Sequence, residues 1–241
     1  MKAQPAQPSP SLTGPCKPGG VGTAAPHDLL WVDGRAGLLA HDPLPSWADD
    51  EWIGFAPVVV RREHVQAPDL IPVGLRGQTR SQRCKAYLHK SCVARRVCPE
   101  ELARFDFVSQ HTHLPAFPAV TAFIRLAPLL DAIGLPWGPT GSVGFALAAG
   151  LPVLHQNSDL DLVVRAARPL GQQQLSSLLA LDGIAQCRID IQIETPFGAF
   201  ALAEFAAGHV EFLLKTDFGP RLTDDPWRAL SERDGTTRNA S

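Results

Sequence analysis

Short apolar runs separated by Pro- and Gly-rich segments mark the first part of the chain. Three of these runs, at 26–32, 56–60 and 70–75, have the length and the Val, Leu and Ile content that is typical of β-strands. Proline within them indicates strand starts or edge positions, because proline lacks the N–H group that a central strand needs. The pattern predicts a smaller, strand-rich N-terminal domain over residues 26–105.

The second half of the chain alternates between helical and strand periodicity. Between residues 116 and 133 the apolar residues recur at helical spacing, and Gly134 directly after them is a typical helix C-cap. Segment 137–142 is predicted as a turn. We therefore expect an α/β (α+β) domain over residues 112–230, with a mixed sheet flanked by helices. The remaining elements that the pattern predicts are helices at 143–149, 170–181 and 200–207 and strands at 160–164, 188–193 and 210–214.

Both ends of the chain are predicted to be poorly ordered. Ten of the first 26 residues are Pro or Gly, which predicts a disordered extension over residues 1–25. No apolar core follows Lys2, so this segment does not resemble a signal peptide. The polar tail at 231–241 is expected to be frayed.

The composition narrows the class of protein. Of 241 residues, 45% are hydrophobic and 19% are charged, which excludes a disordered polyelectrolyte and provides enough chain for a buried core. No apolar run approaches the ~20 residues needed to span a bilayer, so no membrane partner is expected. With 22 basic and 24 acidic side chains, the net charge of -2 argues against a general nucleic-acid-binding surface.

The five cysteines form an odd set without C-x-x-C spacing. Cys84, Cys92 and Cys98 lie near His89, so a zinc site is an open alternative. Their separations of eight and six residues fit no common zinc pattern, however. Reduced, mostly buried thiols in a cytoplasmic protein are the favoured interpretation.

Candidate chemistry lies in the predicted strands of the second half. Within the segment 158–162, positions i and i+2 of a strand share a face, so Asp159 and Asp161 are expected to project together. Two neighbouring carboxylates repel each other unless a cation lies between them or one is protonated, and Mg²⁺ prefers oxygen ligands. If the strand at 188–193 lies beside the first, Asp190 completes a site of three carboxylates.

Such a site supports phosphoryl or nucleotidyl transfer, in which metal ions bind the attacking and leaving oxygens and a carboxylate accepts a proton. Upstream, Gly141 permits close backbone approach, and Ser142 at a predicted helix start is suited to donate to a phosphate oxygen. A D-x-D motif or a Gly-Ser pair alone is common on surface loops. Their order, together with the third aspartate, favours the catalytic interpretation over that alternative.

The order of these motifs resembles the nucleotidyltransferase superfamily related to DNA polymerase beta, although the sixteen residues between Ser142 and Asp159 form a longer spacer than is usual there. From about residue 26 to 228 the chain is similar to one branch, the phosphoribosyl-dephospho-CoA transferases of malonate decarboxylase. The block that follows Asp190 is the most specific part. The matching segments are Pro26-His27-Asp28-Leu29-Leu30-Trp31, Val73-Gly74-Leu75-Arg76-Gly77, Thr140-Gly141-Ser142-Val143-Gly144-Phe145, Ser158-Asp159-Leu160-Asp161-Leu162 and Asp190-Ile191-Gln192-Ile193-Glu194-Thr195-Pro196-Phe197-Gly198-Ala199-Phe200-Ala201-Leu202.

This resemblance implies a nucleotidyltransferase-like second domain and a specific reaction. The donor would be 2'-(5''-triphosphoribosyl)-3'-dephospho-CoA, the acceptor a serine of the apo acyl carrier subunit of malonate decarboxylase, and the leaving group pyrophosphate. It also implies that Asp159 and Asp161 are the catalytic and metal-binding carboxylates, that Asp190 is a third ligand or base, and that Ser142 holds the triphosphate. Mg²⁺ is the expected cofactor.

Basic residues are the second candidate feature. Seven Lys and Arg residues and no acidic residue lie between residues 76 and 96. They are suited to bind the phosphates of the donor or an acidic carrier protein, and a solvated helix or loop face is the open alternative. Arg76, with Gly77 directly after it, is the favoured member. Lys215 and Arg221 are further candidates for phosphate contacts.

Three other polar residues are considered for a catalytic or a structural role. His27 and Asp28 are an alternative catalytic pair, although a pair at a strand entry is more typical of a turn or cap. Glu194 is expected to stabilise the fold or to position other site residues rather than to bind a metal ion.

Together these observations predict a cytoplasmic, Mg²⁺-dependent transferase that modifies an acyl carrier protein. Two alternatives stay open. A nucleotidyltransferase that acts on another small molecule or on RNA would turn over ordinary nucleoside triphosphates. A non-catalytic adaptor would only hold the carrier protein, and the presence of all three aspartates weighs against it.

Overall fold

The computed structural model describes residues 23–79, 81–104 and 107–228. The predicted N-terminal extension, except for residues 23–25, and the predicted tail at 231–241 lie outside the described residues.

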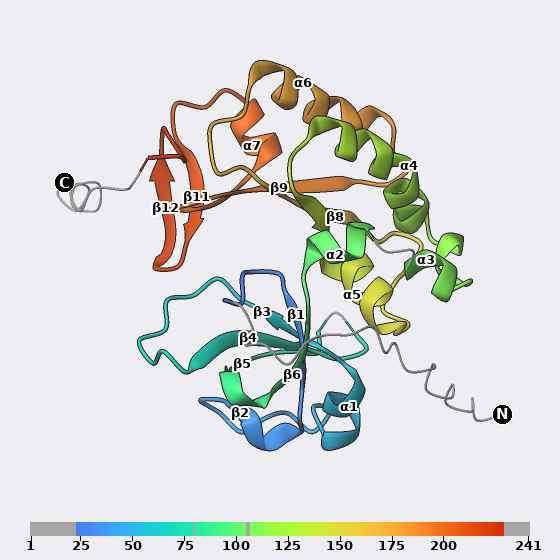
Figure 1. The fold of residues 1–241 in the computed structure, drawn as a ribbon, viewed down its shortest axis with the longest axis vertical. Helices are drawn as coiled ribbons and strands as arrows, with labels where there is room; N and C mark the ends of the chain where they lie inside the picture. The colour runs from blue at the N-terminus through green and yellow to red at the C-terminus, as the bar shows by residue number, and fades with distance from the viewer. Residues whose placement is uncertain (1–22, 80, 105–106, 229–241) are drawn as a thin grey trace.

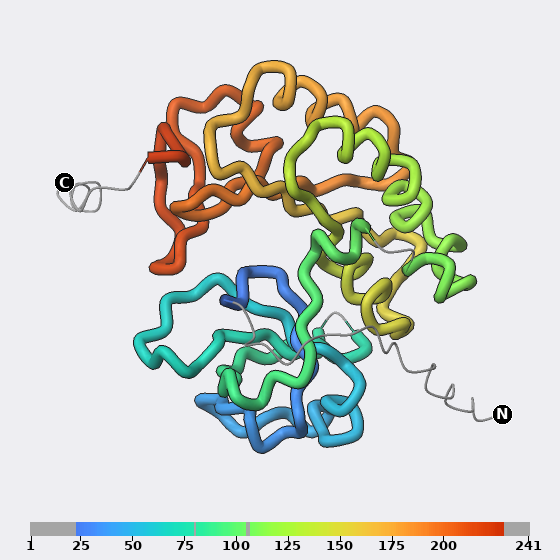
Figure 2. Tube along the Cα trace, in the orientation of Figure 1, coloured from blue at the N-terminus to red at the C-terminus, as the bar shows by residue number. Residues whose placement is uncertain are grey.

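The first sheet is built from the N-terminal part of the chain and forms the lower half of the molecule in Figures 1 and 2. Its six strands lie in the order β2-β5-β4-β3-β1-β6, and their pairings are antiparallel. The prediction of a strand-rich N-terminal part is confirmed. The elements are β1 (Leu29–Val32), β2 (Leu38–Leu39), α1 (Asp50–Phe55), β3 (Val58–Val60), β4 (Leu70–Arg76), β5 (Arg83–His89) and β6 (Val93–Val97), with 3₁₀ helices at Arg35–Gly37 and Lys90–Cys92.

The residues of strand β4 show how the two faces of this sheet differ. Ile71, Val73 and Leu75 are buried in a cluster of apolar side chains on one face. Because successive residues of a strand point to opposite sides, Gly74 and Arg76 face the other way, toward the second half of the molecule.

Most described residues of the basic segment 76–96 lie in strands, whereas we considered a helix or loop face as the alternative. The described residues between β4 and β5 form a turn, and Lys90–Cys92 is a 3₁₀ helix. In β5, Ala86 and Leu88 are buried while Arg83 and Lys85 are exposed, which is a period of two. Charged residues at every second position make this strand hard to predict from the sequence, because only one of its faces is apolar.

The second sheet has six strands in the order β12-β11-β10-β9-β8-β7. All pairs are antiparallel except β8 and β9, which are parallel and are joined by a crossover through α6. The predicted mixed sheet flanked by helices is therefore confirmed. The elements are α2 (Pro99–Arg104), α3 (Phe107–Gln110), α4 (Pro118–Ile133), β7 (Trp137–Pro139), α5 (Gly141–Ala149), β8 (Leu160–Arg165), α6 (Gln172–Ala180), β9 (Ile189–Thr195), β10 (Gly198–Ala201), α7 (Leu202–Ala206), β11 (Phe212–Thr216) and β12 (Gly219–Thr223), with 3₁₀ helices at Leu114–Ala116 and Leu181–Gly183.

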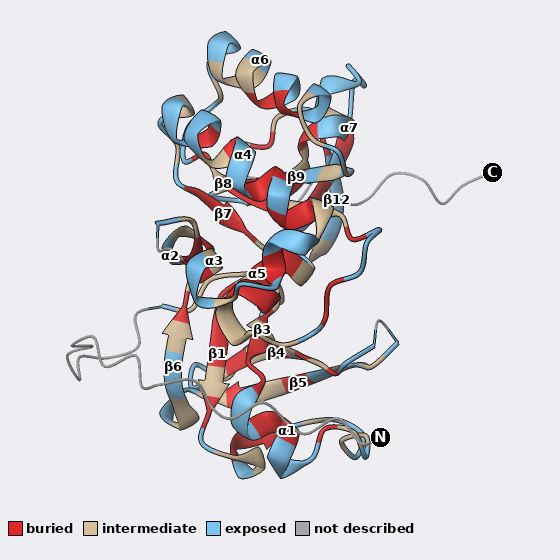
Figure 3. Ribbon diagram, turned by 90° about the vertical axis from the view of Figure 1, so that its right-hand side faces the viewer, coloured by how far each residue is buried: buried red, intermediate tan, exposed pale blue. Residues whose placement is uncertain are grey.

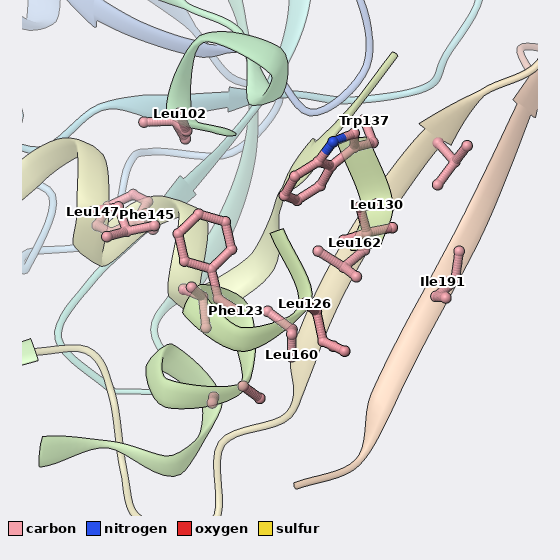
Figure 4. Packing of buried hydrophobic residues seen from close by; sticks show 14 of the residues in the cluster. Leu102, Phe123, Leu126, Leu130, Trp137, Phe145, Leu147, Leu160, Leu162 and Ile191 are labelled. Carbon is pink, nitrogen blue, oxygen red and sulfur yellow. The ribbon is translucent and has the colours of Figure 1, made fainter. Parts of the chain in front are cut away.

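Helices α4, α6 and α7 cover one face of this sheet, and the other face is turned toward the first sheet (Figure 1). On the covered face, Leu160 and Leu162 of β8 pack near Leu126 and Leu130 of α4 (Figure 4). Fully burying each leucine contributes about 1.5–3 kcal/mol, so this packing fixes which face of β8 points away from the helices.

Two predicted elements of the second half are wrong in detail. Segment 137–142, predicted as a turn, begins with strand β7, and the helix predicted at 200–207 begins only at Leu202, because Gly198–Ala201 forms β10. Both strands are short, and they form because they pair with β8 and β9. The periodicity of the chain itself does not show that pairing.

Buried side chains connect the two sheets, in addition to the separate cluster that fills one face of the first sheet. The larger apolar cluster joins Leu29 and Val97 of the first sheet to Leu102 of α2, Phe145 of α5 and the core of the second sheet. Figure 3 shows buried segments running from β1 and β3 through α5 to β7. Part of the junction between the halves is thus packed with apolar side chains.

Candidate active site

Two aspartates lie side by side on the face of the second sheet that is turned toward the first. Asp161 of β8 and Asp190 of β9 are register partners in the parallel pair. Because Leu160 and Ile191 beside them are buried on the helix-covered face, both carboxylates project from the opposite face. Asp159 directly precedes β8. The structure thus brings together Asp161 and Asp190 and places Asp159 at the start of the same strand.

The charge on Asp161 is poorly compensated. Burial is the largest cause that raises the pKa of this carboxyl, and the charges of Asp190 and Asp159 raise it further, while His27 and Arg76 act weakly in the opposite direction. Within the described part of the chain, no hydrogen bond reaches the carboxylate oxygens of the three aspartates. Repulsion between carboxylates that lack donors is what a bound cation relieves.

The donor groups present at this position fit Mg²⁺ that is shared with a substrate. Mg²⁺ is usually held by one or two carboxylates together with substrate phosphates, and Asp161 and Asp190 supply that number. Among residues 23–79, 81–104 and 107–228, no group of three or more His, Cys, Asp and Glu side chains is arranged to hold a metal ion by itself. Asp161 and Asp190 could therefore hold a metal ion only together with further ligands, such as those that a substrate supplies.

The cysteines do not provide a second metal site within these described residues. Cys84, Cys92, Cys98 and Cys187 are free thiols that are half-buried rather than mostly buried as predicted, and no cluster of metal-binding side chains includes them. Cys16 lies outside the described residues.

Gly141 brings the start of helix α5 against the aspartates. Its φ of 56° lies in the left-handed region, and a Cβ atom at this position would lie 1.8 Å from Oδ2 of Asp161. The N–H of Thr140 donates to the carbonyl oxygen of Asp161 at 2.9 Å, which ties the two segments together. The side chain of Thr140 makes no capping hydrogen bond, so the first N–H groups of α5 are suited to bind an anion beside Asp161.

Arg76 and Ser142 meet across the junction between the two sheets. Nη2 of Arg76, at the end of β4, donates to Oγ of Ser142 at 2.9 Å, and its guanidinium lies 5.4 Å from the ring centre of Phe145. Both residues were predicted to bind phosphate. Their contact places a cation and a hydroxyl at the start of α5.

The two remaining predicted residues lie on opposite faces of the second sheet. Nζ of Lys215 donates to Oε1 of Gln192 at 3.2 Å, on the face that carries Asp190. Arg221 is the register partner of Leu214, which is buried under the helices, so Arg221 lies on the other face at the edge strand β12. The structure brings Lys215 toward the aspartates and Arg221 away from them.

A polar network that the sequence did not predict lies beside this site. Glu194 is buried on the aspartate-bearing face of β9, where it pairs with Arg62 from the first sheet's half of the chain. Nε2 of His27 lies 3.4 Å from Oε1 of Glu194 and 2.8 Å from Nε2 of Gln192. Glu194 therefore has the structural role that was predicted, and these contacts join the two halves next to Asp161.

His27 and Asp28 do not form a catalytic pair. The Asp28 carboxylate is fully buried and accepts hydrogen bonds from the N–H of Ala25 at 2.8 Å and from Nε of Arg96 at 2.6 Å. It shapes the turn that holds His27 at a φ of 75°. A positive φ in a histidine is uncommon, and nothing in the sequence around His27 signals it.

The buried Glu194 leads to a prediction on acid stability. Burial favours a higher pKa for this carboxyl, but the hydrogen bond from His27 and the charge and hydrogen bond of Arg62 outweigh burial and lower the pKa to about 2. Because the folded-state pKa is depressed, the stabilisation is complete above the ordinary pKa of 4.5 and is lost as the pH falls toward about 2. The shift corresponds to a contribution on the order of 3 kcal/mol.

We expect the free energy of unfolding of the wild-type protein, measured with urea, to fall between about pH 5 and about pH 3 more steeply than that of a Glu194→Gln variant. Equal slopes for the two proteins would contradict the assignment. Comparing the slopes cancels the contributions of the other carboxyl groups.

Comparisons with known proteins now identify the family. The family described as "Phosphoribosyl-dephospho-CoA transferase MdcG C-terminal domain" matches residues 102–226, and its N-terminal counterpart matches residues 25–99. The chain belongs to the phosphoribosyl-dephospho-CoA transferase family. The first match begins within α2 and extends past β12, so it includes the three aspartates, and the second covers the first sheet.

Several curated relatives carry the name phosphoribosyl-dephospho-CoA transferase. The protein from Pseudomonas putida is 45% identical over 208 residues, which is 86% of this chain and 97% of the relative. Relatives from Klebsiella pneumoniae (strain 342) and Pseudomonas syringae pv. tomato are 42% and 41% identical and cover 85% and 84% of this chain, or 97% and 92% of the relatives. No solved structure matches the chain. Membership in this family makes the protein a transferase, and the resemblance seen in the sequence is confirmed.

No helix in the described part of the chain has the length and apolar character needed to cross a membrane.

Proposed function

We propose that the protein transfers the 2'-(5''-phosphoribosyl)-3'-dephospho-CoA group from its 5''-triphosphoribosyl donor to a serine of the apo acyl carrier subunit of malonate decarboxylase. The observation that carries this proposal is the pair Asp161 and Asp190 beside the open start of helix α5, in a chain that belongs to this family. Carboxylates next to a phosphate-binding helix start are what phosphoryl-group transfer requires.

The reaction balances as a substitution at phosphorus. The serine oxygen of the carrier forms a bond to the α-phosphorus of the donor's triphosphate, and the bond from that phosphorus to the bridging oxygen breaks, so that pyrophosphate leaves. The proton of the serine hydroxyl passes to a carboxylate. Asp190, the exposed register partner of Asp161, is suited to accept it.

The residues around the aspartates would orient the donor. The first N–H groups of α5, the Ser142 hydroxyl and Arg76 face the position where a triphosphate would lie against Gly141. Lys215 extends the positive charge along the same face of the sheet. Asp161 and Asp190 would hold Mg²⁺, which when bound neutralises charge that develops on the phosphates, and Asp159 at the start of β8 adds negative charge beside them.

The acceptor and the location follow from this assignment. We propose a cytoplasmic enzyme whose acceptor is a folded carrier protein rather than nucleic acid or a membrane. Arg221, on the far face of the sheet, has no part in the proposed chemistry.

The direct test is mass spectrometry of the apo-carrier after incubation with enzyme, Mg²⁺ and the triphosphoribosyl donor. We expect the carrier to gain the mass of one phosphoribosyl-dephospho-CoA group at a serine, with one pyrophosphate released per carrier. Transfer from ordinary nucleoside triphosphates without a carrier would support the alternative nucleotidyltransferase. Donor and carrier binding without any mass gain would support the adaptor.

A further inference from the structure

A cavity of about 440 Å³ lies between the first sheet and helix α5, next to the proposed reaction site. Its apolar lining comes from both halves of the molecule, with Leu29 and Val59 on the sheet, Leu102 on α2 and Phe145 on α5. Gly141 lies at its edge, in contact with Asp161. A cavity of this size admits a nucleoside-sized group and has the mainly apolar lining that is usual for ligand sites.

The same cavity is strongly basic. Arg61, Arg76, Arg83 and Lys85 line it, and no Asp or Glu among the described residues does. Arg61 is paired with Glu63, but Arg83 and Lys85 make no ion pair within the part of the chain that the structure describes. Two uncompensated cations beside an apolar lining favour a ligand with both an anionic and an apolar part.

Gly74 keeps the floor of the cavity open. It lies in the middle of β4, opposite Lys85 of β5, where a glycine weakens a strand. A Cβ atom at this position would meet nothing closer than Cδ of Arg61 at 3.5 Å, which is ordinary contact. Packing within the protein therefore does not require glycine here, whereas close approach of a ligand to the strand would.

We propose that this cavity binds the dephospho-CoA body of the donor, with its nucleoside against the apolar lining and its diphosphate against Arg83 and Lys85. The inference rests on the proposed function and names the part of the donor that the first sheet recognises. A triphosphate is polar throughout and gains nothing from Leu29, Val59 and Phe145. The triphosphate end instead lies at the edge of the cavity, where Gly141 meets Asp161.

The test uses 3'-dephospho-CoA, which lacks the triphosphoribosyl group, and the full-length protein without carrier or added metal. Isothermal titration calorimetry should show binding to the wild-type protein. Arg83→Glu and Lys85→Glu should each weaken it by about tenfold or more, because each replaces a charged contact by repulsion. Gly74→Val, which fills the cavity, should weaken it at least as much.

Lys90→Glu is the matched control, because Lys90 is an exposed base of the same segment that does not line the cavity. It should leave dephospho-CoA binding unchanged. Arg83 and Lys85 are exposed, so unfolding temperatures near that of the wild type are expected for their variants and would show that lost binding is not lost folding.

Three outcomes would overturn the proposal. The first is no binding of dephospho-CoA to the wild type, and the second is binding by both charge reversals that is as tight as that of the wild type. The third is displacement of dephospho-CoA by inorganic tripolyphosphate, which would assign the cavity to the triphosphate. The failures of the two proposals are distinguishable. If the variants bind dephospho-CoA as predicted but the carrier is not modified, only the proposed transfer is refuted. If both charge-reversal variants modify the carrier with the wild-type KM for the donor, only the assignment of the cavity is refuted.

Discussion

Replacing Asp161 by asparagine is expected to reduce transfer to the carrier by about 10²–10³-fold, the range for loss of one group that stabilises charge in the transition state. The same change should stabilise the folded protein. Burial and the charges of Asp190 and Asp159 raise the pKa of Asp161, so the ionised form is disfavoured in the fold. For a carboxyl with a raised pKa, stability present at low pH is lost as the pH rises through the folded-state pKa, and a neutral amide avoids that loss.

The combination of lower activity with higher stability separates a catalytic role from a structural one. Activity would be measured as pyrophosphate release with donor and apo-carrier, and stability as the thermal unfolding midpoint at neutral pH. Adding Mg²⁺ should raise the midpoint of the wild type more than that of the variant, because the variant lacks the charge that attracts the cation.

Asp182→Asn is the matched control for this prediction. Asp182 lies exposed in the 3₁₀ helix Leu181–Gly183, so the change from carboxylate to amide should leave both activity and the Mg²⁺ response unchanged. Near-wild-type transfer by Asp161→Asn would remove the basis of the active-site assignment. A variant that loses both activity and stability would instead indicate a structural role for Asp161.

The sequence predicts the strands that carry the aspartates because their signal is local. In β8 and β9 the apolar side chains occupy every second position near Asp161 and Asp190, since one face of each strand packs against helices. That alternation fixes the face of each carboxylate. It does not fix which strands are neighbours, and the parallel pairing of β8 with β9 comes from the crossover through α6.

The features that the sequence does not predict depend on contacts between segments that are far apart in the chain. Glu194 pairs with Arg62 and lies beside His27, which precede it by more than a hundred residues, and no spacing rule links them. The face of Arg221 likewise follows from its register with Leu214 and not from its own surroundings in the chain. The cavity is a further example, because it exists only where the first sheet meets α5.

The short strands β7 and β10 were also not predicted, because they too depend on their neighbours in the sheet. Trp137–Pro139 and Gly198–Ala201 contain glycine, proline and alanine, which are poor indicators of strands. Their neighbours in the sheet supply the hydrogen bonds and the buried surface that hold them extended. The sequence pattern therefore predicts the central strands but not the strands whose conformation depends on pairing with their neighbours.

The second large effect is expected for Gly141→Ala, which should reduce transfer by about a hundredfold or more and also lower the stability of the fold. A Cβ atom at residue 141 would lie 1.8 Å from Oδ2 of Asp161, far inside any permitted contact, so the carboxylate must move away from the start of α5. A displacement of about 1 Å in a reacting group can cost that much in rate. The positive φ of residue 141 adds strain of about 1–2 kcal/mol for any residue other than glycine.

Gly134→Ala separates the two causes, because Gly134 also has a positive φ, of 77°, but nothing lies within 4 Å of the position of its Cβ. It should show the loss of stability without the loss of transfer, measured as the unfolding midpoint and as pyrophosphate release with donor and carrier. If the two variants lose equal amounts of activity, strain in the backbone rather than contact with Asp161 explains the effect. If Gly141→Ala transfers the group at the wild-type rate, the start of α5 and Asp161 do not act together on the donor, and the phosphate-binding role assigned to this turn is wrong.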